Sequence, residues 1–400
     1  MDRVYFCGRI LTGAGGEVKQ NQYVSVENGK IVSVSSQRPP ECTDIVDWSG
    51  YTVMPGLINC HTHVGIVPAA DSNLVLTYPL AQRVILIQKH LVQLLASGVT
   101  TIRDLGCYDD MDIQIRDCIR NEFIIGPDMF VSGPMLTMTG GHSYTVGVEV
   151  DGKDTCRKAA RQRLKSGADL VKVMATGGVL TKGVEPGNAQ LSCEEMTVIC
   201  EEAHKAGKKV AAHAQGTTGI QNALNAGVDS IEHGFFMNQK IIDQMVRKGV
   251  YYVPTFCAPY FMACKGKELG LAQEFIDKVY NSLEAHASSF TCALNSGVKI
   301  ACGTDAGTPF NGHDMTAKEI VLLCEHGMSN AQAIQAATQN AAECIGVADR
   351  GKIESGLLAD MIAVEGNPLE DIHCLETSVR YVVKRGRLFD TDVLKRSLLE

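Results

Sequence analysis

The sequence lacks any uninterrupted apolar run of about 18 residues, the length that a transmembrane helix needs. It also lacks a Lys/Arg-rich cluster, and its formal net charge is -8. Nucleic acids and anionic membranes both require clustered positive charge, so neither is an expected partner. We therefore expect a cytoplasmic protein that binds a small molecule, and the sequence leaves open whether the chain forms a homo-oligomer.

No CxxC pair occurs among the 15 cysteines, which are odd in number and scattered along the chain. Several of them, including Cys7, Cys60 and Cys302, stand inside apolar patterns. A reduced thiol there behaves as a small hydrophobic group. We expect these cysteines to pack in the core rather than to form disulfides, bind metal or act in catalysis.

Both ends of the chain show the alternation of apolar and polar residues that is typical of β-strands. QYVSVENGKIVSV carries the turn signal Asn28-Gly29 between two such runs, which predicts a hairpin. ADMIAVEG and SVRYVVKRGRLF near the C-terminus have the same character. We predict a small, discontinuous β-sandwich domain formed by residues 1–53 and 355–400.

Between these ends, short apolar runs alternate with helical patterns, an order that predicts an α/β fold with a parallel sheet. The candidate strands are TVMPGLINC, TTIRDLG, DMFVSG, LVKVMAT, KVAAHAQ, DSIEHG, YYVPTF and KIACGTDAG. Eight such units predict a (β/α)8 TIM barrel over residues 54–354, with the active site at the carboxyl ends of the strands. Capping-box patterns at Ser192 with Glu195 and at Ser329 with Gln332 predict helix starts.

Metal-ligand residue types recur at the ends of these candidate strands. His61 and His63 end the first strand, and period-two alternation points both imidazoles to one side. His213 ends the fifth strand, His233 the sixth and Asp305 the eighth. Converging imidazoles and a carboxylate suit zinc or a similar cation, so this set predicts a metal site above the barrel.

Lys172 lies within the apolar fourth strand, where a buried ammonium group would be costly. One interpretation is that its side chain points outward, with the head in solvent. The other is that a lowered pKa leaves a free amine, which combines with carbon dioxide to form a carbamate able to bridge two metals.

The motif set PGLINCHTH, VKVMATGG, AAHAQG, SIEHG and CGTDAG resembles the amidohydrolase superfamily, in its subtype with a binuclear metal centre and a carboxylated lysine. The stretches TGGVLTKG, NAQLSCEEM and AHKAGKKVAAHAQG are similar to the prolidase-like, or Xaa-Pro dipeptidase-like, branch. The resemblance extends to GLLADMIAVEGNPLEDI near the C-terminus and covers nearly the whole chain.

This resemblance implies two divalent ions, with zinc favoured and manganese, iron or cobalt also compatible. It assigns His61, His63 and Asp305 to the more buried ion, His213 and His233 to the more exposed one, and carboxylated Lys172 to both. It also implies that a metal-bridging hydroxide attacks the substrate and that Asp305 acts as general base and then acid.

Other residues are candidates for contact with the substrate. His142 follows two glycines in MTGGHSYTVG, so its ring could lean over the metals. Some relatives carry a tyrosine where this chain has Phe235, and Tyr144 or Arg103 are candidates to replace its hydroxyl group. His313, which follows the last strand, is a further candidate.

We expect hydrolysis of the amide bond of a dipeptide or an N-acyl amino acid. A cyclic amide of the imidazolone or hydantoin type is an alternative, because the chemistry at the metals would be the same. A non-catalytic scaffold on the same fold is a third reading, although such proteins usually lose ligands.

Overall fold

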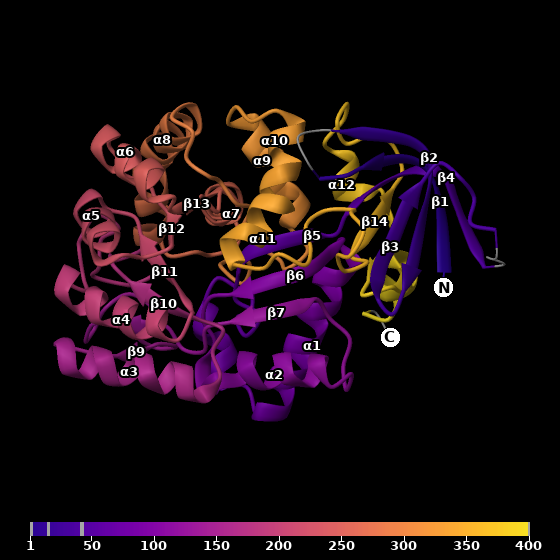
Figure 1. Ribbon diagram of the computed structural model, residues 1–400. Coiled ribbons are helices and arrows are strands. Elements are labelled where there is room, and N and C mark those ends of the chain that lie inside the picture. The colour runs from indigo at the N-terminus through magenta and orange to yellow at the C-terminus, as the bar shows by residue number, and fades with distance from the viewer. Residues whose placement is uncertain (1–2, 14–16, 41–43, 399–400) are drawn as a thin grey trace.

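The computed structural model describes residues 3–13, 17–40 and 44–398. Figure 1 shows a sheet of terminal strands beside a larger unit of parallel strands covered by helices. Among the described residues, no helix is both long and apolar enough to cross a lipid bilayer.

The terminal sheet has seven strands, in the order β16-β15-β14-β4-β1-β2-β3. They are β1 (Arg3–Leu11), β2 (Val18–Glu27), β3 (Lys30–Ser35), β4 (Ile45–Pro55), β14 (Met361–Val364), β15 (Val379–Lys384) and β16 (Arg387–Asp390). The predicted hairpin turn joins β2 to β3, and both Asn28 and Gly29 have positive φ values, as a tight two-residue turn requires. Both ends of the chain thus contribute to one sheet.

The interior of the terminal sheet is apolar. Alternating residues of β1 and β4 bury Tyr5, Ile10 and Trp48, and the rings of Tyr5 and Trp48 lie 4.4 Å apart between centroids. Trp48 also stacks on Tyr381 of β15 at 5.7 Å. Large rings therefore fill this core.

The larger unit contains two parallel sheets. One has the order β5-β6-β7, with β5 (Leu57–Thr62), β6 (Val99–Asp104) and β7 (Asp128–Val131). The other has the order β13-β12-β11-β10-β8-β9, with β8 (Leu136–Thr137), β9 (Val148–Glu149), β10 (Leu170–Met174), β11 (Lys209–Ala214), β12 (Ser230–His233) and β13 (Tyr251–Val253). All pairs within these sheets are parallel, so the predicted α/β class is confirmed.

Helices alternate with these strands and cover them. They are α1 (Leu80–Ala96), α2 (Met111–Arg120), α3 (Lys153–Ser166), α4 (Cys193–Lys205), α5 (Thr217–Ala226), α6 (Gln239–Lys248), α7 (Cys257–Lys265), α8 (Gln273–Asn295), α9 (Thr316–Glu325), α10 (Asn330–Ala336) and α11 (Gln339–Ile345). Two short helices, α12 (Cys374–Thr377) and α13 (Thr391–Arg396), lie near the C-terminus. Both predicted capping boxes are present, at the starts of α4 and α10.

Two predicted strands differ from the structure. The first is divided, because residues up to Pro55 belong to β4 of the terminal sheet and β5 begins at Leu57. The eighth, residues 299–307, is not a regular strand, but its backbone bonds on both sides. The Tyr252 amide donates to the carbonyl of Lys299 at 2.9 Å, and the Cys60 amide donates to the carbonyl of Cys302 at 2.8 Å. This segment therefore links β13 of one sheet to β5 of the other.

Candidate metal centre and its pocket

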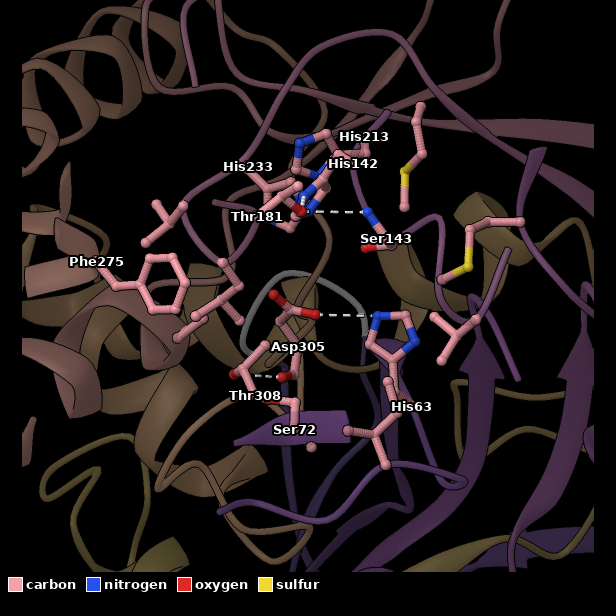
Figure 2. A pocket seen from close by; sticks show the side chains of 18 of the residues that line it. His63, Ser72, His142, Ser143, Thr181, His213, His233, Phe275, Asp305 and Thr308 are labelled. Atoms are coloured by element: carbon pink, nitrogen blue, oxygen red, sulfur yellow. Dashed lines mark hydrogen bonds and ion pairs between the residues drawn. The ribbon is translucent and has the colours of Figure 1, made fainter. Parts of the chain in front are cut away.

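One cavity, of about 350 Å³, opens where the parallel strands end. All the side chains predicted as metal ligands line it: His61, His63, Lys172, His213, His233 and Asp305. In Figure 2 Asp305 faces His63 across this cavity, and the rings of His213 and His233 lie together on another side. Residues far apart in sequence thus meet in one place.

The tightest group within this set is His61, His233 and Asp305, whose candidate ligand atoms all lie within 4.8 Å of one another. Oδ1 of Asp305 lies 3.3 Å from Nε2 of His61 and 3.1 Å from Nε2 of His63. Burial alone would raise the pKa of Asp305, but His61 and His63 lower it well below its usual value. Asp305 is therefore an ionised carboxylate among imidazoles.

Each of the four imidazoles has one ring nitrogen committed to an acceptor outside the cavity. Nδ1 of His61 donates to the Glu232 carboxylate at 2.9 Å, and Nδ1 of His63 donates to the carbonyl of Gly106 at 3.0 Å. Nε2 of His213 donates to the carbonyl of Gly177 at 2.8 Å.

Nδ1 of His233 likewise donates to the hydroxyl oxygen of Thr255 at 2.8 Å. The Thr255 hydroxyl group can only accept this bond, because its own proton is donated to the carbonyl of Pro254. Burial also lowers the pKa of both His213 and His233 well below the usual value, which keeps these rings neutral. A neutral imidazole that donates through one nitrogen carries a lone pair on the other, which is the form that binds a metal.

Lys172 completes the lining from β10. Its side chain is almost fully buried, and burial lowers its pKa to about 8. Among the described residues, Nζ of Lys172 has no hydrogen-bond partner, and Nε2 of His61 has only its ion-pair contact with Asp305. Buried polar atoms are rarely left so, and those that are point to an ion or modification that the bare chain does not supply. The donor set thus fits divalent cations.

Backbone geometry at the strand ends is also unusual. His233 has a φ of 71° and Asp305 a φ of 58°, in the left-handed region that residues with side chains rarely adopt. Thr255, the partner of His233, has a φ of 57°. These turns re-aim the side chains at the point where each segment leaves the sheet.

Arg103, a candidate for contact with the substrate, lies beneath the cavity and does not line it. Its guanidinium group donates to Glu232 at 2.8 Å, to Ser230 at 3.0 Å and to the carbonyl of Cys60 at 2.6 Å. Glu232, in turn, holds His61. Burial would raise the pKa of Glu232, but Arg103 and His61 lower it to about 2.

Sequence reasoning missed Glu232, although the signal that identified Lys172 was available. Both residues are charged side chains inside otherwise apolar strands, where a charge needs a partner.

His313, the other candidate that follows the last strand, also lies outside the cavity lining. Its ring is buried and stacks on the ring of His90 at 3.8 Å. Nε2 of His313 bonds with the carbonyl of His63 at 3.1 Å, and Nδ1 of His90 bonds with the carbonyl of Val64 at 2.8 Å. The pair supports the backbone that follows the HxH motif.

The remaining candidates, His142, Tyr144 and Phe235, do line the cavity. The ring of His142 lies 4.4 Å from that of His213, and burial lowers its pKa to about 4. Tyr144 is half exposed at the rim, whereas Phe235 is buried in the wall. The wall beside Phe235 is apolar and includes Val179, Leu180, Ala258, Met262 and Phe275.

Comparison with known proteins agrees with this geometry. Residues 52–389 match the model of the Amidohydrolase family, and the chain therefore belongs to the amidohydrolase family. It is a hydrolase that acts on carbon–nitrogen bonds, as predicted.

Its relatives support the prolidase-like branch of this family. Ochratoxinase from Aspergillus niger is 33% identical, with 96% of this chain and 86% of the relative covered. A crystal structure of a Xaa-Pro dipeptidase with bound methionine in the active site is 35% identical, with a TM-score of 0.91 over 97% of this chain and 99% of that one. A prolidase complexed with N-methylphosphonate-L-proline is 30% identical, with the same TM-score and the same coverage.

Proposed function

We propose that this protein hydrolyses the amide bond of a dipeptide or an N-acyl amino acid. The observation that carries the proposal is the cavity itself, in which four imidazoles, a carboxylate and an unpartnered lysine converge. Within the amidohydrolase family, this set suits activation of water for attack on an amide.

The ligands would hold two divalent cations, zinc being the favoured metal. His61, His63 and Asp305 would hold one cation and His213 and His233 the other, with Lys172 carboxylated by carbon dioxide between them. When bound, such cations lower the pKa of a water molecule and polarise the amide carbonyl.

Asp305 is the residue that would move the proton. As an ionised carboxylate facing the cavity, it accepts a proton from the attacking water and then gives it to the departing amine. His142 stands on the opposite side, above His213, where its ring can donate a hydrogen bond to a substrate oxygen.

The apolar wall supports a substrate with an apolar side chain next to the scissile bond. Phe235, Met262 and Phe275 bring aromatic and thioether surface to one side of the cavity, and Lys182 lies near the rim. An aliphatic or aromatic residue would be desolvated against this wall. The methionine and the proline analogue named for the two structural relatives are molecules of this kind.

We also propose that the two parallel sheets and the segment 299–307 form one closed (β/α)8 barrel over residues 54–354. The hydrogen bonds of that segment to β13 and β5 support closure on one side. On the other side, the Asp169 amide donates to the carbonyl of Val131 at 2.8 Å. The terminal strands, from residues 1–53 and 355–400, would form the second domain.

The test is an amide library assayed with enzyme reconstituted with two equivalents of zinc or manganese. The library should contain dipeptides, N-acyl amino acids and lactams of the imidazolone and hydantoin type. Release of an amino acid with an apolar side chain is the expected result, and Asp305→Asn should abolish it. Turnover of the lactams alone would shift the assignment to cyclic amides, and inactivity on the whole library would overturn it.

A further inference from the structure

The loop between β10 and α4 surrounds His142 on two sides. We infer that residues 177–185 of this loop hold the His142 ring in its working position, and that Lys278 of α8 fastens the loop. The inference rests on the proposed function, since that function gives His142 its task. It names Gly178, Thr181 and Lys278 as positioning residues, outside the set of metal ligands.

Gly178 lies against one face of the His142 ring. A Cβ atom added at this glycine would lie 2.4 Å from Cε1 and 2.5 Å from Nε2 of His142. Real side chains never pack so closely, so the ring can occupy its place only because residue 178 has no side chain. The other face of the ring is turned toward His213, at 4.4 Å between centroids.

Thr181 forms the second side. Its hydroxyl group lies 2.8 Å from Nδ1 of His142, and the Ser143 amide approaches the same oxygen at 3.4 Å. Figure 2 shows Thr181 beside the histidine rings and linked to Ser143. This contact with Nδ1 sets the rotation of the ring and leaves Nε2 as the atom available on the other side.

Lys278 secures the turn that carries Thr181. Its ammonium group is buried and donates to the carbonyls of Thr181 at 3.1 Å and Val184 at 2.9 Å, and to the carboxylate of Glu274 at 2.8 Å. An ammonium group has three donors, so all of them are used. Glu274 also accepts from the Gly183 amide at 3.2 Å, which ties the tip of the loop to the same ion pair.

These contacts form one chain from α8 to the cavity. Loops on protein surfaces are generally mobile, and a catalytic side chain needs to be held within a fraction of an ångström. Here an ion pair on a long helix, with the ammonium group of Lys278 buried, supplies the rigidity that the loop lacks. The same loop contributes Val179 and Leu180 to the apolar wall, so the fastening sets one side of the substrate pocket as well.

The first test compares two substitutions of one hydroxyl group. Thr181→Val keeps the shape of the side chain and removes the contact with His142, and kcat should fall about tenfold with metal content unchanged. Thr181→Ser keeps the hydroxyl group and should keep kcat. A purely structural role would favour valine over serine, so equal rates, or a faster valine variant, would overturn the inference.

The second test uses two glycines of the same loop. Gly178→Ala should displace the His142 ring and lower kcat by about a hundredfold, with a smaller change in KM. Gly187→Ala is the matched control, because nothing lies within 4 Å of a Cβ atom there and its φ is not positive. Equal activity of the two variants would refute the role of Gly178.

The third test measures how firmly Lys278 holds the loop, with a readout that does not depend on catalysis. Lys278→Met should speed trypsin cleavage after Lys182, at the tip of the loop, and should lower kcat. Lys299→Met, which removes another ion-paired lysine, is the control and should leave both unchanged. If Lys278→Met does not fold, Glu274→Gln weakens the same ion pair from a partly exposed position.

Unchanged cleavage in the folded variant would overturn the proposed fastening. Wild-type enzyme that is inactive on every amide, yet shows this protection from trypsin, would refute the proposed function and leave the fastening standing.

Discussion

The two β-rich regions of this protein have interiors of opposite chemistry. In the terminal sheet, Tyr5, Ile10 and Trp48 fill the core with aromatic and aliphatic groups. Among the parallel strands, by comparison, Arg103, Lys172 and Glu232 are buried to the same degree. Both regions are built on β-strands, so the presence of strands alone does not tell which region carries chemistry.

Burial of charge separates the two regions. A charged group removed from water costs several kcal/mol unless it is paired. Arg103 and Glu232 offset each other beneath the cavity, whereas Nζ of Lys172 has no hydrogen-bond partner among the described residues. Buried charged side chains therefore mark the region that carries the functional site. Substitutions in the two regions should differ in their effects on activity and metal binding.

Lys172→Ala should give the largest effect. Loss of the proposed bridging ligand should lower kcat/KM about a thousandfold and release at least one metal ion, since metal activation is worth several kcal/mol. Activity assays and elemental analysis measure both changes, and small carboxylates such as acetate should restore part of the rate. Lys209→Ala, at the start of β11, is the control. Normal metal content and rate in Lys172→Ala would refute the carbamate.

Glu232→Gln should have the next largest effect. The carboxylate that accepts from His61 becomes a neutral amide, and Arg103 loses its counter-charge. We expect metal affinity to fall about 10- to 100-fold, measured by competition with a chelator. Ser230→Ala, which removes a neutral hydroxyl group bonded to Glu232 and Arg103 and leaves both charges in place, should have a smaller effect. Equal affinity in Glu232→Gln and wild type would show that this buried pair serves stability alone.

Asp128→Asn tests the ion pairs that join the parallel strands to the terminal sheet. Asp128 of β7 contacts Arg350 at 2.9 Å, and also Lys384 and Arg385 near the β15–β16 turn. Burial would raise the pKa of Asp128, but these cations hold it well below the usual value. Its contribution is therefore present above the unfolded pKa, near 4, and is lost as pH falls through the folded pKa.

The Asp128→Asn variant should unfold with a free energy about 2 kcal/mol lower at pH 7, and the difference should shrink toward pH 3. Denaturant titrations at several pH values measure this, with Asp277→Asn on α8 as the control. A difference that stays constant with pH would contradict the electrostatic explanation.

Ile10→Val should give the smallest effect, a loss of about 1 kcal/mol in the free energy of unfolding. Because Ile10 lies in the apolar core of the terminal sheet, kcat/KM and metal content should not change. A fall in activity with intact metal content would mean that the terminal sheet takes part in shaping the site.

Much of the fold was predictable because its signals are periodic. Alternation in the terminal strands, the Asn28-Gly29 turn and the capping boxes all depend on near neighbours in sequence. The eighth strand was harder, since residues 299–307 bond to their neighbours too sparsely to form a regular strand.

The cavity was predictable where ligands lie at the carboxyl ends of strands, as His61 and His233 do. Arg103 and His313 do not line the cavity, and sequence order does not show whether a side chain points into the cavity or beneath it. Thr181 and Lys278 gave no signal, since nearly a hundred residues separate two groups that meet at 3.1 Å.

The left-handed backbone at His233 and Asp305 has a consequence for anyone who wishes to make this enzyme more robust. Such conformations cost on the order of 1 to 3 kcal/mol each in residues other than glycine. Glycine at either position would relieve that cost and remove a ligand in the same step. The places where the fold has most to gain are thus the places where it can least be changed, and improvement must come from elsewhere in the chain.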